Sequence, residues 1–191
     1  MVPYYNKPCQ RGLYSHFKAL AENTHLPILL YNVPGRTGVD MVDDTTLALA
    51  RDYENIVGIK DATGDLTRGQ YLLDNRPEDF LVISGDDATA LELTLMGGQG
   101  DISVTANVAP AAMAEAFELA LAGQAEEARG IYQRLMGLHT DLFVESSPSP
   151  SKYCLAKMGM LGENLRLPLV PTAPEHHGKL DAAMRQAGIE L

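Results

Sequence analysis

The sequence predicts an α/β protein built around a parallel β-sheet. Short runs rich in aliphatic and β-branched residues alternate with longer amphipathic stretches over residues 1–107. These short runs are apolar almost throughout, which is typical of parallel strands that helices cover. Strand patterns that alternate with helix patterns indicate parallel strands joined by crossover helices. Periodicity alone does not distinguish a closed barrel from an open, doubly wound sheet, so both architectures stay open at this point.

Four strands are predicted, and each follows a helical stretch. The strands are residues 26–33, 55–62, 80–87 and 100–107, and the helices before them are residues 12–23, 43–53, 66–75 and 88–96. Beyond residue 107 only helical patterns remain, at residues 110–121, 125–142, 152–158 and 174–187. Pro110 opens the first of these helices and Gly188 ends the last. We therefore expect a β/α part over residues 1–122 and a helical part over residues 123–191.

Composition excludes several classes of function. The 15 basic and 25 acidic residues give a net charge of −10, which would repel a nucleic-acid backbone. No apolar run reaches the length of a membrane span, and no basic leader is evident. Cys9 and Cys154 form neither a disulfide framework nor a CxxC pair. We therefore expect a cytoplasmic protein without nucleic-acid or membrane partners.

Polar residues collect where the predicted strands end. Tyr31 lies near the end of the first strand and Lys60 near the end of the second, while residues 84–87 and 105–107 close the third and fourth. The carboxyl ends of parallel strands meet at one edge of a sheet. Barrels and doubly wound sheets both place their active sites there. The sequence therefore predicts a functional site at this edge.

Lys60 follows the apolar run of the second strand, in the segment IVGIKDATG. Lysine is seldom buried without a purpose, because removing an ammonium from water costs much free energy. A partly buried lysine supplies the neutral amine that attacks a ketone to form an imine. The alternative is a strand-end lysine that extends its ammonium into solvent. Judged alone, Lys60 fits this alternative better.

Tyr31 and Arg36 lie near the end of the preceding strand and just after it. In a parallel sheet in register, Tyr31 and Lys60 open into the same mouth, where a phenol can relay protons. Arg36 lies in a turn rich in proline and glycine, and its guanidinium suits a substrate carboxylate. The alternatives are an ordinary interior tyrosine and a surface arginine paired with Asp40 or Asp43. Judged singly, each residue again favours its alternative.

The adjacent acids Asp86 and Asp87 do not predict a metal site. A divalent cation needs further ligands, and the five histidines have no suitable spacing. We expect one of the two aspartates to cap the helix that follows. The GGQG run at residues 97–100 precedes a strand and not a helix, so we expect a tight turn there rather than a phosphate-binding loop.

Five segments carry a resemblance to a known family. They are PYYNKP at residues 3–8, YNVPGRTG at 31–38, GIKDATGD at 58–65, SGDD at 84–87 and ISVTANVAP at 102–110. In order and spacing they resemble the dihydrodipicolinate synthase family of class I pyruvate aldolases, from residue 2 to about residue 170. The resemblance implies a (β/α)8 TIM barrel followed by helices. This chain would then hold the end of strand four and strands five to eight, so residues 1–122 would be a partial barrel.

The resemblance implies roles for particular residues. Lys60 would form the Schiff base with pyruvate, and Tyr31 would shuttle protons to and from the bound substrate. Arg36 would bind the carboxylate of aspartate semialdehyde. Tyr5 would reach across a dimer interface into the partner's proton relay. Gly85 and Ile102 match positions that line the pyruvate pocket. Tyr4 matches a position in an interface cleft where lysine inhibits some members.

The resemblance further implies a lyase that condenses pyruvate with aspartate semialdehyde to 4-hydroxy-tetrahydrodipicolinate, in diaminopimelate and lysine biosynthesis. It implies an imine on Lys60 with no metal and no organic cofactor, and a homotetramer built as a dimer of dimers. N-acetylneuraminate lyase, 2-keto-3-deoxygluconate aldolase and 4-hydroxy-2-oxoglutarate aldolase share the lysine and the tyrosine. Arg36 and the KDATGD run favour the synthase over these sister aldolases.

Measured against this family, about 100 further residues would precede Met1. They would hold strands one to three and a threonine that links the two tyrosines of the relay. An open half-sheet exposes unpaired strand edges and an apolar face. We therefore expect the 191-residue chain by itself to be inactive or unstable unless it is partnered. An inactive remnant with only an assembly role stays a second hypothesis.

Overall fold

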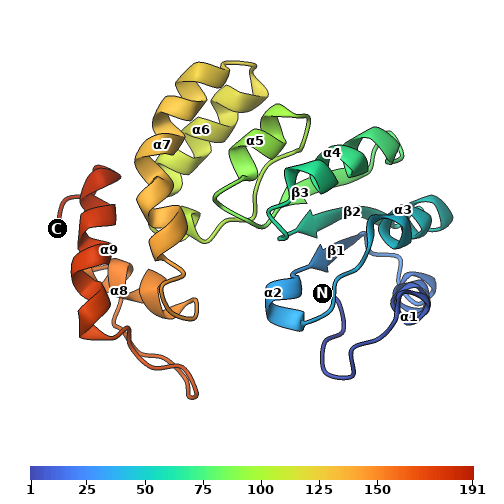
Figure 1. Cartoon of the computed structure of the whole chain (residues 1–191), viewed down its shortest axis with the longest axis horizontal. Helices are drawn as coiled ribbons and strands as arrows, with labels where there is room; N and C mark the ends of the chain where they lie inside the picture. The colour runs from blue at the N-terminus through green and yellow to red at the C-terminus, as the bar shows by residue number, and fades with distance from the viewer. The chain divides into compact units, whose positions relative to one another are not determined.

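The computed structural model describes all 191 residues and divides into two compact units, Met1–Ile102 and Ser103–Leu191. The first unit holds a β-sheet with its helices, and the second unit is helical (Figure 1). The boundary expected between residues 122 and 123 lies at the turn between two helices of the second unit. Because that boundary was drawn between a barrel part and a helical part, and not between compact units, it stays a prediction.

Three parallel strands form the sheet of the first unit, in the order β1 (Ile28–Asn32), β2 (Ile56–Asp61) and β3 (Leu81–Ser84) (Figure 1). The helices of this unit are α1 (Gln10–Glu22), α2 (Pro34–Thr37), α3 (Asp43–Asp52), α4 (Leu66–Asn75) and α5 (Ala90–Leu95). Helices α3, α4 and α5 contact the sheet, and α1 packs against α3. The parallel sheet and its first three strands are therefore as predicted.

The register of the strands decides which side chains share a face of the sheet. Leu30 pairs with Ile59, which pairs with Val82, and all three side chains are fully buried in the apolar core. Successive side chains of a strand point to opposite faces. Tyr31 and Lys60, which pair with each other in the next row, therefore lie on the face opposite this core.

Local chemistry fixes several helix ends. The side chain of Asp65 accepts hydrogen bonds from the backbone N–H groups of Thr67 and Arg68, so α4 begins where two of its free donors are satisfied. Helix α2 begins with Pro34 and ends at Gly38, whose φ of 64° places it in the left-handed region that glycine adopts at little cost. The sequence predicted α4 at its observed bounds, and only a turn where α2 lies.

The fourth predicted strand, residues 100–107, was a wrong prediction. Only Asp101 forms an isolated parallel bridge, with Ser84, and Thr105–Asn107 form a 3-10 helix, η1. The hydroxyl of Ser103 accepts a hydrogen bond of 2.9 Å from a backbone N–H of η1, which stabilises this turn locally. The β-branched residues of the segment favoured a strand, and side-chain bonding to the backbone overrides that preference.

The second unit is built from η1 and four α-helices: α6 (Pro110–Leu121), α7 (Ala125–Asp141), α8 (Ser149–Lys157) and α9 (Pro174–Gln186). Helix α7 packs against both α6 and α9. His139 of α7 is buried, shares a hydrogen bond of 2.8 Å with Thr105 of η1, and lies 4.4 Å from the ring of Tyr132 between ring centroids. These contacts make His139 part of the packing. None of the helices is long and apolar enough to cross a membrane.

The carboxyl group of Asp101 lies in the first unit beside Asp87, whose side chain is only 2% exposed. Burial is the main cause that raises the pKa of Asp101, to about 9, and the hydrogen bond and negative charge of Asp87 add to it. The positive charge of Lys60 opposes this rise. The folded protein therefore holds a proton on Asp101 at neutral pH.

This proton makes stability depend on pH in a defined direction. Because the pKa of Asp101 is raised from 3.8, the unfolded chain releases a proton that the folded chain keeps, and the free energy of unfolding falls as pH rises from about 4 towards 9. Asp101→Asn has no such proton. We therefore expect the melting temperature of the variant minus that of the wild type to be larger at pH 9 than at pH 6, by about 4 °C or more.

Differential scanning calorimetry at both pH values measures this gain. Asp79→Asn is the matched control, because Asp79 is an exposed acid of the same unit. A melting-temperature difference for Asp101→Asn that is the same at pH 6 and pH 9 would contradict the assignment of the proton.

Candidate functional site

Lys60 and Tyr31 form the centre of the candidate site, at the carboxyl ends of β2 and β1. They pair across the two strands, and the Nζ atom of Lys60 lies 4.3 Å from the centroid of the Tyr31 ring. Both side chains are half-buried. An ammonium over a ring face at this distance is attracted by the negative face of the ring. The predicted meeting of these two side chains at one edge of the sheet is therefore confirmed.

Gly85 follows the end of β3 and lies directly against the side chain of Lys60. A Cβ atom at residue 85 would lie 2.5 Å from Cε of Lys60 and 2.9 Å from Cβ of Ala62. The backbone N–H of Gly85 also donates a hydrogen bond of 2.8 Å to the carbonyl of Asp61. A side chain at residue 85 would therefore force Lys60 or Ala62 to move, so Gly85 borders the side chain of Lys60, and its role in a pyruvate pocket stays a prediction.

Arg36 lies in α2, four residues beyond the end of the paired part of β1, and its side chain is exposed. The alternative that it pairs with Asp40 or Asp43 is wrong, because both carboxylates form ion pairs with Arg68, at 2.8 Å and 2.7 Å. The guanidinium of Arg36 therefore stays available to a ligand at the same edge of the sheet as Lys60.

The structure does not gather every predicted site residue. Tyr4 and Tyr5 are 56% and 93% exposed, and neither has a hydrogen bond or ring contact with Lys60. Ile102 is 47% exposed and donates its backbone N–H to the carbonyl of Ser84, at the end of β3. Ile102 thus lies at the predicted edge of the sheet, while Tyr4 and Tyr5 present their rings to the outside of this unit.

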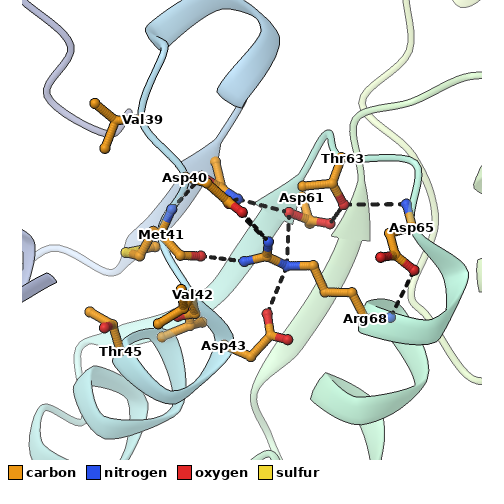
Figure 2. Close-up of polar contacts among 12 residues, drawn as sticks. Val39, Asp40, Met41, Val42, Asp43, Thr45, Asp61, Thr63, Asp65 and Arg68 are labelled. Atoms are coloured by element: carbon orange, nitrogen blue, oxygen red, sulfur yellow. Dashed lines mark hydrogen bonds and ion pairs between the residues drawn. The ribbon is translucent and has the colours of Figure 1, made fainter. Parts of the chain in front are cut away.

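A cluster of charged groups lies on the other face of the sheet, behind Lys60 and Tyr31. Its centre is Arg68 of α4, and its acids are Asp40, Asp43 and Asp61 (Figure 2). We call these four residues the Arg68 cluster. Sequence reasoning missed it, because no local pattern shows that residues so far apart meet. The one local signal was Asp65, whose capping of α4 fixes where the helix begins and so which way Arg68 points.

Asp61 connects this cluster to the site residues. It follows Lys60 in β2, is only 6% exposed, and accepts hydrogen bonds from Asn32 at 3.3 Å and from the hydroxyl of Thr63. Burial raises the pKa of Asp61, while Thr63, Arg68 and Asn32 each oppose the rise. Asn32 follows Tyr31 in the same way, so each site residue has a buried, hydrogen-bonded neighbour on the opposite face.

The acidic pair after β3 serves structure. Oδ2 of Asp86 accepts hydrogen bonds from the hydroxyl of Thr89, at 2.7 Å, and from its backbone N–H, at 3.2 Å, just before α5 begins. The predicted capping of α5 by one of the two aspartates is wrong, because the N-cap of α5 is Thr89 and Asp86 bonds to Thr89 rather than to an N–H group within the helix. No group of three or more His, Cys, Asp and Glu side chains is placed to hold a metal ion. The turn at Gly97–Gly100, with φ of 115° and 128° at its two ends, is as predicted.

Comparisons with known proteins agree with this geometry. The sequence model of the dihydrodipicolinate synthetase family matches residues 1–187. A 4-hydroxy-tetrahydrodipicolinate synthase of Nitrosospira multiformis is 56% identical over 191 residues, which are 100% of this chain and 63% of that protein. A second such synthase, of Pseudomonas putida, is 54% identical over 189 residues, or 99% of this chain and 64% of that protein.

Solved structures show the same fold. The chloride-inhibited dihydrodipicolinate synthase of Acinetobacter baumannii, in complex with pyruvate, superimposes with a TM-score of 0.95 at 51% identity, over 98% of this chain and 64% of that chain. The enzyme of Cyanidioschyzon merolae with lysine bound superimposes with a TM-score of 0.93 at 39% identity, over 99% and 64%.

The chain thus spans just under two thirds of the length of the relatives it matches. Its α/β fold is the corresponding part of theirs, and almost its whole length takes part in the match. By sequence and by structure, the chain belongs to the dihydrodipicolinate synthetase family.

Proposed function

We propose that the protein carrying this chain condenses pyruvate with aspartate semialdehyde to 4-hydroxy-tetrahydrodipicolinate, through an imine on Lys60. The observation that carries the proposal is the placement of Lys60 against Tyr31 and Gly85 at the carboxyl ends of three parallel strands. The names of the relatives support the synthase over its sister aldolases. Pyruvate bound to the Acinetobacter baumannii enzyme supports the first substrate.

The chemistry needs one amine and one proton relay. The neutral amine of Lys60 attacks C2 of pyruvate, the ketone oxygen leaves as water, and an imine forms. Loss of a proton from C3 gives an enamine, whose C3 bonds to the aldehyde carbon while the aldehyde oxygen takes up a proton. The amino group of the second substrate then displaces Lys60 at C2 and closes the ring. We assign the proton transfers to Tyr31, whose ring lies against the lysine.

The imine carbon itself draws electrons from C3, so we propose a reaction without a metal or an organic cofactor. Arg36 would bind the carboxylate of aspartate semialdehyde through the two-pronged geometry of its guanidinium. Ile102 and Gly85 would line the pyruvate pocket. Supporting observations are the exposed guanidinium of Arg36 and the lack of space at residue 85 beside Lys60.

We further propose that β1, β2 and β3 are strands five, six and seven of a (β/α)8 barrel, with the bridge at Asp101 in the place of strand eight. The backbone N–H of Val2 donates a hydrogen bond of 2.9 Å to the carbonyl of Tyr31, which supports residues 1 and 2 as the end of strand four. The relatives are longer than this chain, so the inactivity or instability of the chain by itself stays a prediction.

The assembly is proposed as a homo-oligomer, a dimer of dimers, in the cytoplasm. Tyr5 would enter the proton relay of a neighbouring subunit, and Tyr4 would line a regulatory cleft for lysine. The high exposure of both rings in this unit supports an interface there. Lysine bound to the Cyanidioschyzon merolae enzyme supports such regulation in a relative.

Trapping with borohydride tests the imine. On incubation with pyruvate and sodium borohydride, we expect the peptide that contains Lys60 to gain the mass of a reduced pyruvate adduct, because borohydride reduces an imine to a stable amine. Mass spectrometry of the digested protein measures it. Lys60→Arg keeps the positive charge and should give no adduct. A folded protein without an adduct on Lys60 would support the inactive remnant instead.

Gly85→Ala tests the space around the lysine. The added methyl would lie 2.5 Å from Cε of Lys60, so it must displace the reactive amine. We expect the trapping rate to fall by about 100-fold, the loss typical of a misplaced reacting group. Gly130→Ala is the matched control, since Gly130 lies exposed within α7 with open space at its Cβ. It should keep the trapping rate, and equal losses in both variants would refute the steric argument.

Arg36→Gln tests the second substrate. It removes the positive charge proposed for the carboxylate of aspartate semialdehyde, so we expect KM for that substrate to rise about 10-fold or more, the effect of a lost charged hydrogen bond. The rate of trapping by pyruvate should not change. Steady-state kinetics with aspartate semialdehyde, and with N-acetylmannosamine and glyceraldehyde as competing acceptors, measures both effects. An unchanged KM would remove Arg36 from the site.

A further inference from the structure

Arg68 is the third residue of α4, with its side chain 11% exposed, on the face of the sheet opposite Lys60. We propose that Arg68 is a positioning residue: it fixes the ends of β1 and β2 and the loop after α2, and thereby the relative placement of Lys60, Tyr31 and Arg36. The proposal rests on the proposed function of these three residues, and it adds a residue that touches no substrate.

The first contact holds the loop after α2. Nη1 of Arg68 binds both carboxylate oxygens of Asp40, at 2.8 Å and 3.0 Å, and Nη2 donates to the carbonyl of Met41 (Figure 2). Gln10 of α1 holds the same loop through the carbonyl of Asp40, at 2.8 Å. Asp40 follows Arg36 by four residues, so the loop fixed here directly follows the helix that carries Arg36.

The second contact holds the strand ends. Nε of Arg68 forms an ion pair of 2.7 Å with Asp43 and lies 3.8 Å from Oδ1 of Asp61. Asn32 joins the two parts of the cluster, because its Nδ2 donates to Asp40 at 2.7 Å and to Asp61 at 3.3 Å. Since Asn32 follows Tyr31 and Asp61 follows Lys60, a rotation of either strand end would break these bonds before it could turn the site residues.

The charges of the cluster explain why an arginine is needed. Three carboxylates face one guanidinium, and burial raises the pKa of both Asp43 and Asp61. The planar guanidinium donates in several directions at once, whereas a lysine ammonium is a single point charge. A lysine at residue 68 would keep the positive charge but not all of these directions. Charge and geometry can therefore be separated by substitution.

The variants are made in the whole polypeptide that carries these residues. Arg68→Lys keeps charge and loses geometry, and Arg68→Gln loses both. Asp40→Asn removes the charge of the carboxylate that follows α2 and leaves the ion pairs of Arg68 with Asp43 and Asp61 in place. Arg76→Gln is the control, because Arg76 is a part-buried arginine at the other end of α4 that binds the carbonyl of Phe80 at 2.7 Å and Gln99 at 2.8 Å. Arg76 thus supports the same helix, but near the start of β3 and not at the carboxyl ends of β1 and β2.

We expect Arg68→Lys to lower kcat/KM for aspartate semialdehyde by about 10- to 100-fold, the range for a reacting group misplaced by about 1 Å. Asp40→Asn should raise KM for aspartate semialdehyde and keep the rate of pyruvate trapping, whereas Arg68→Gln should also slow trapping. Hydrogen exchange of residues 33–43 and 60–65 should speed up in the Arg68 variants. Arg76→Gln should change none of these values, even where it lowers the melting temperature.

A merely structural role predicts another pattern. Then Arg68→Lys and Arg76→Gln would lose melting temperature alike while kcat/KM per folded protein stays at the wild-type value, and the proposal would be overturned. Failure of the proposed function is distinct, because the wild type itself would then trap no pyruvate. In that case the exchange rates of residues 33–43 and 60–65 still decide whether Arg68 holds the two strand ends.

Discussion

The side chains of β1 and β2 alternate between the two faces of the sheet, and the register between the strands decides which face each residue takes. Tyr31 pairs with Lys60, and Asn32 pairs with Asp61. A shift by one residue would exchange the faces, burying the ammonium of Lys60 and exposing Ile59. The apolar rows therefore specify the register, and the register in turn brings the site residues together.

The same alternation places strong polar groups next to the apolar core. Asn32 and Asp61 are 0% and 6% exposed, in strands whose neighbouring residues pack against helices. A buried carboxylate without partners would be costly, and removing one partner of a buried ion pair costs about 3–5 kcal/mol. Arg68 and Asn32 supply those partners here. The sheet thus ends in a hydrogen-bonded layer that tolerates little displacement.

Local signals in the sequence predicted much of this fold, but they did not predict contacts between residues far apart in the sequence. The pattern placed α4 and α6 at their observed bounds, and the structure shows that both starts are fixed within one turn, by the capping side chain of Asp65 and by Pro110. It also placed Lys60 beside Tyr31, since parallel strands carry their ends to one edge. The prediction of a strand at residues 100–107 was wrong, because β-propensity takes no account of a hydroxyl that hydrogen-bonds to a nearby backbone N–H.

The Arg68 cluster could not be predicted in this way, since Asp40 and Arg68 are 28 residues apart and meet only when the sheet and its helices are packed. For the same reason the alternative prediction, an ion pair of Arg36 with the nearby Asp40 or Asp43, was wrong. Their engagement elsewhere has a chemical consequence. An arginine whose nearby acids are held by another arginine keeps its own charge for a ligand. The buried face of the sheet thereby helps to determine what the open face can bind.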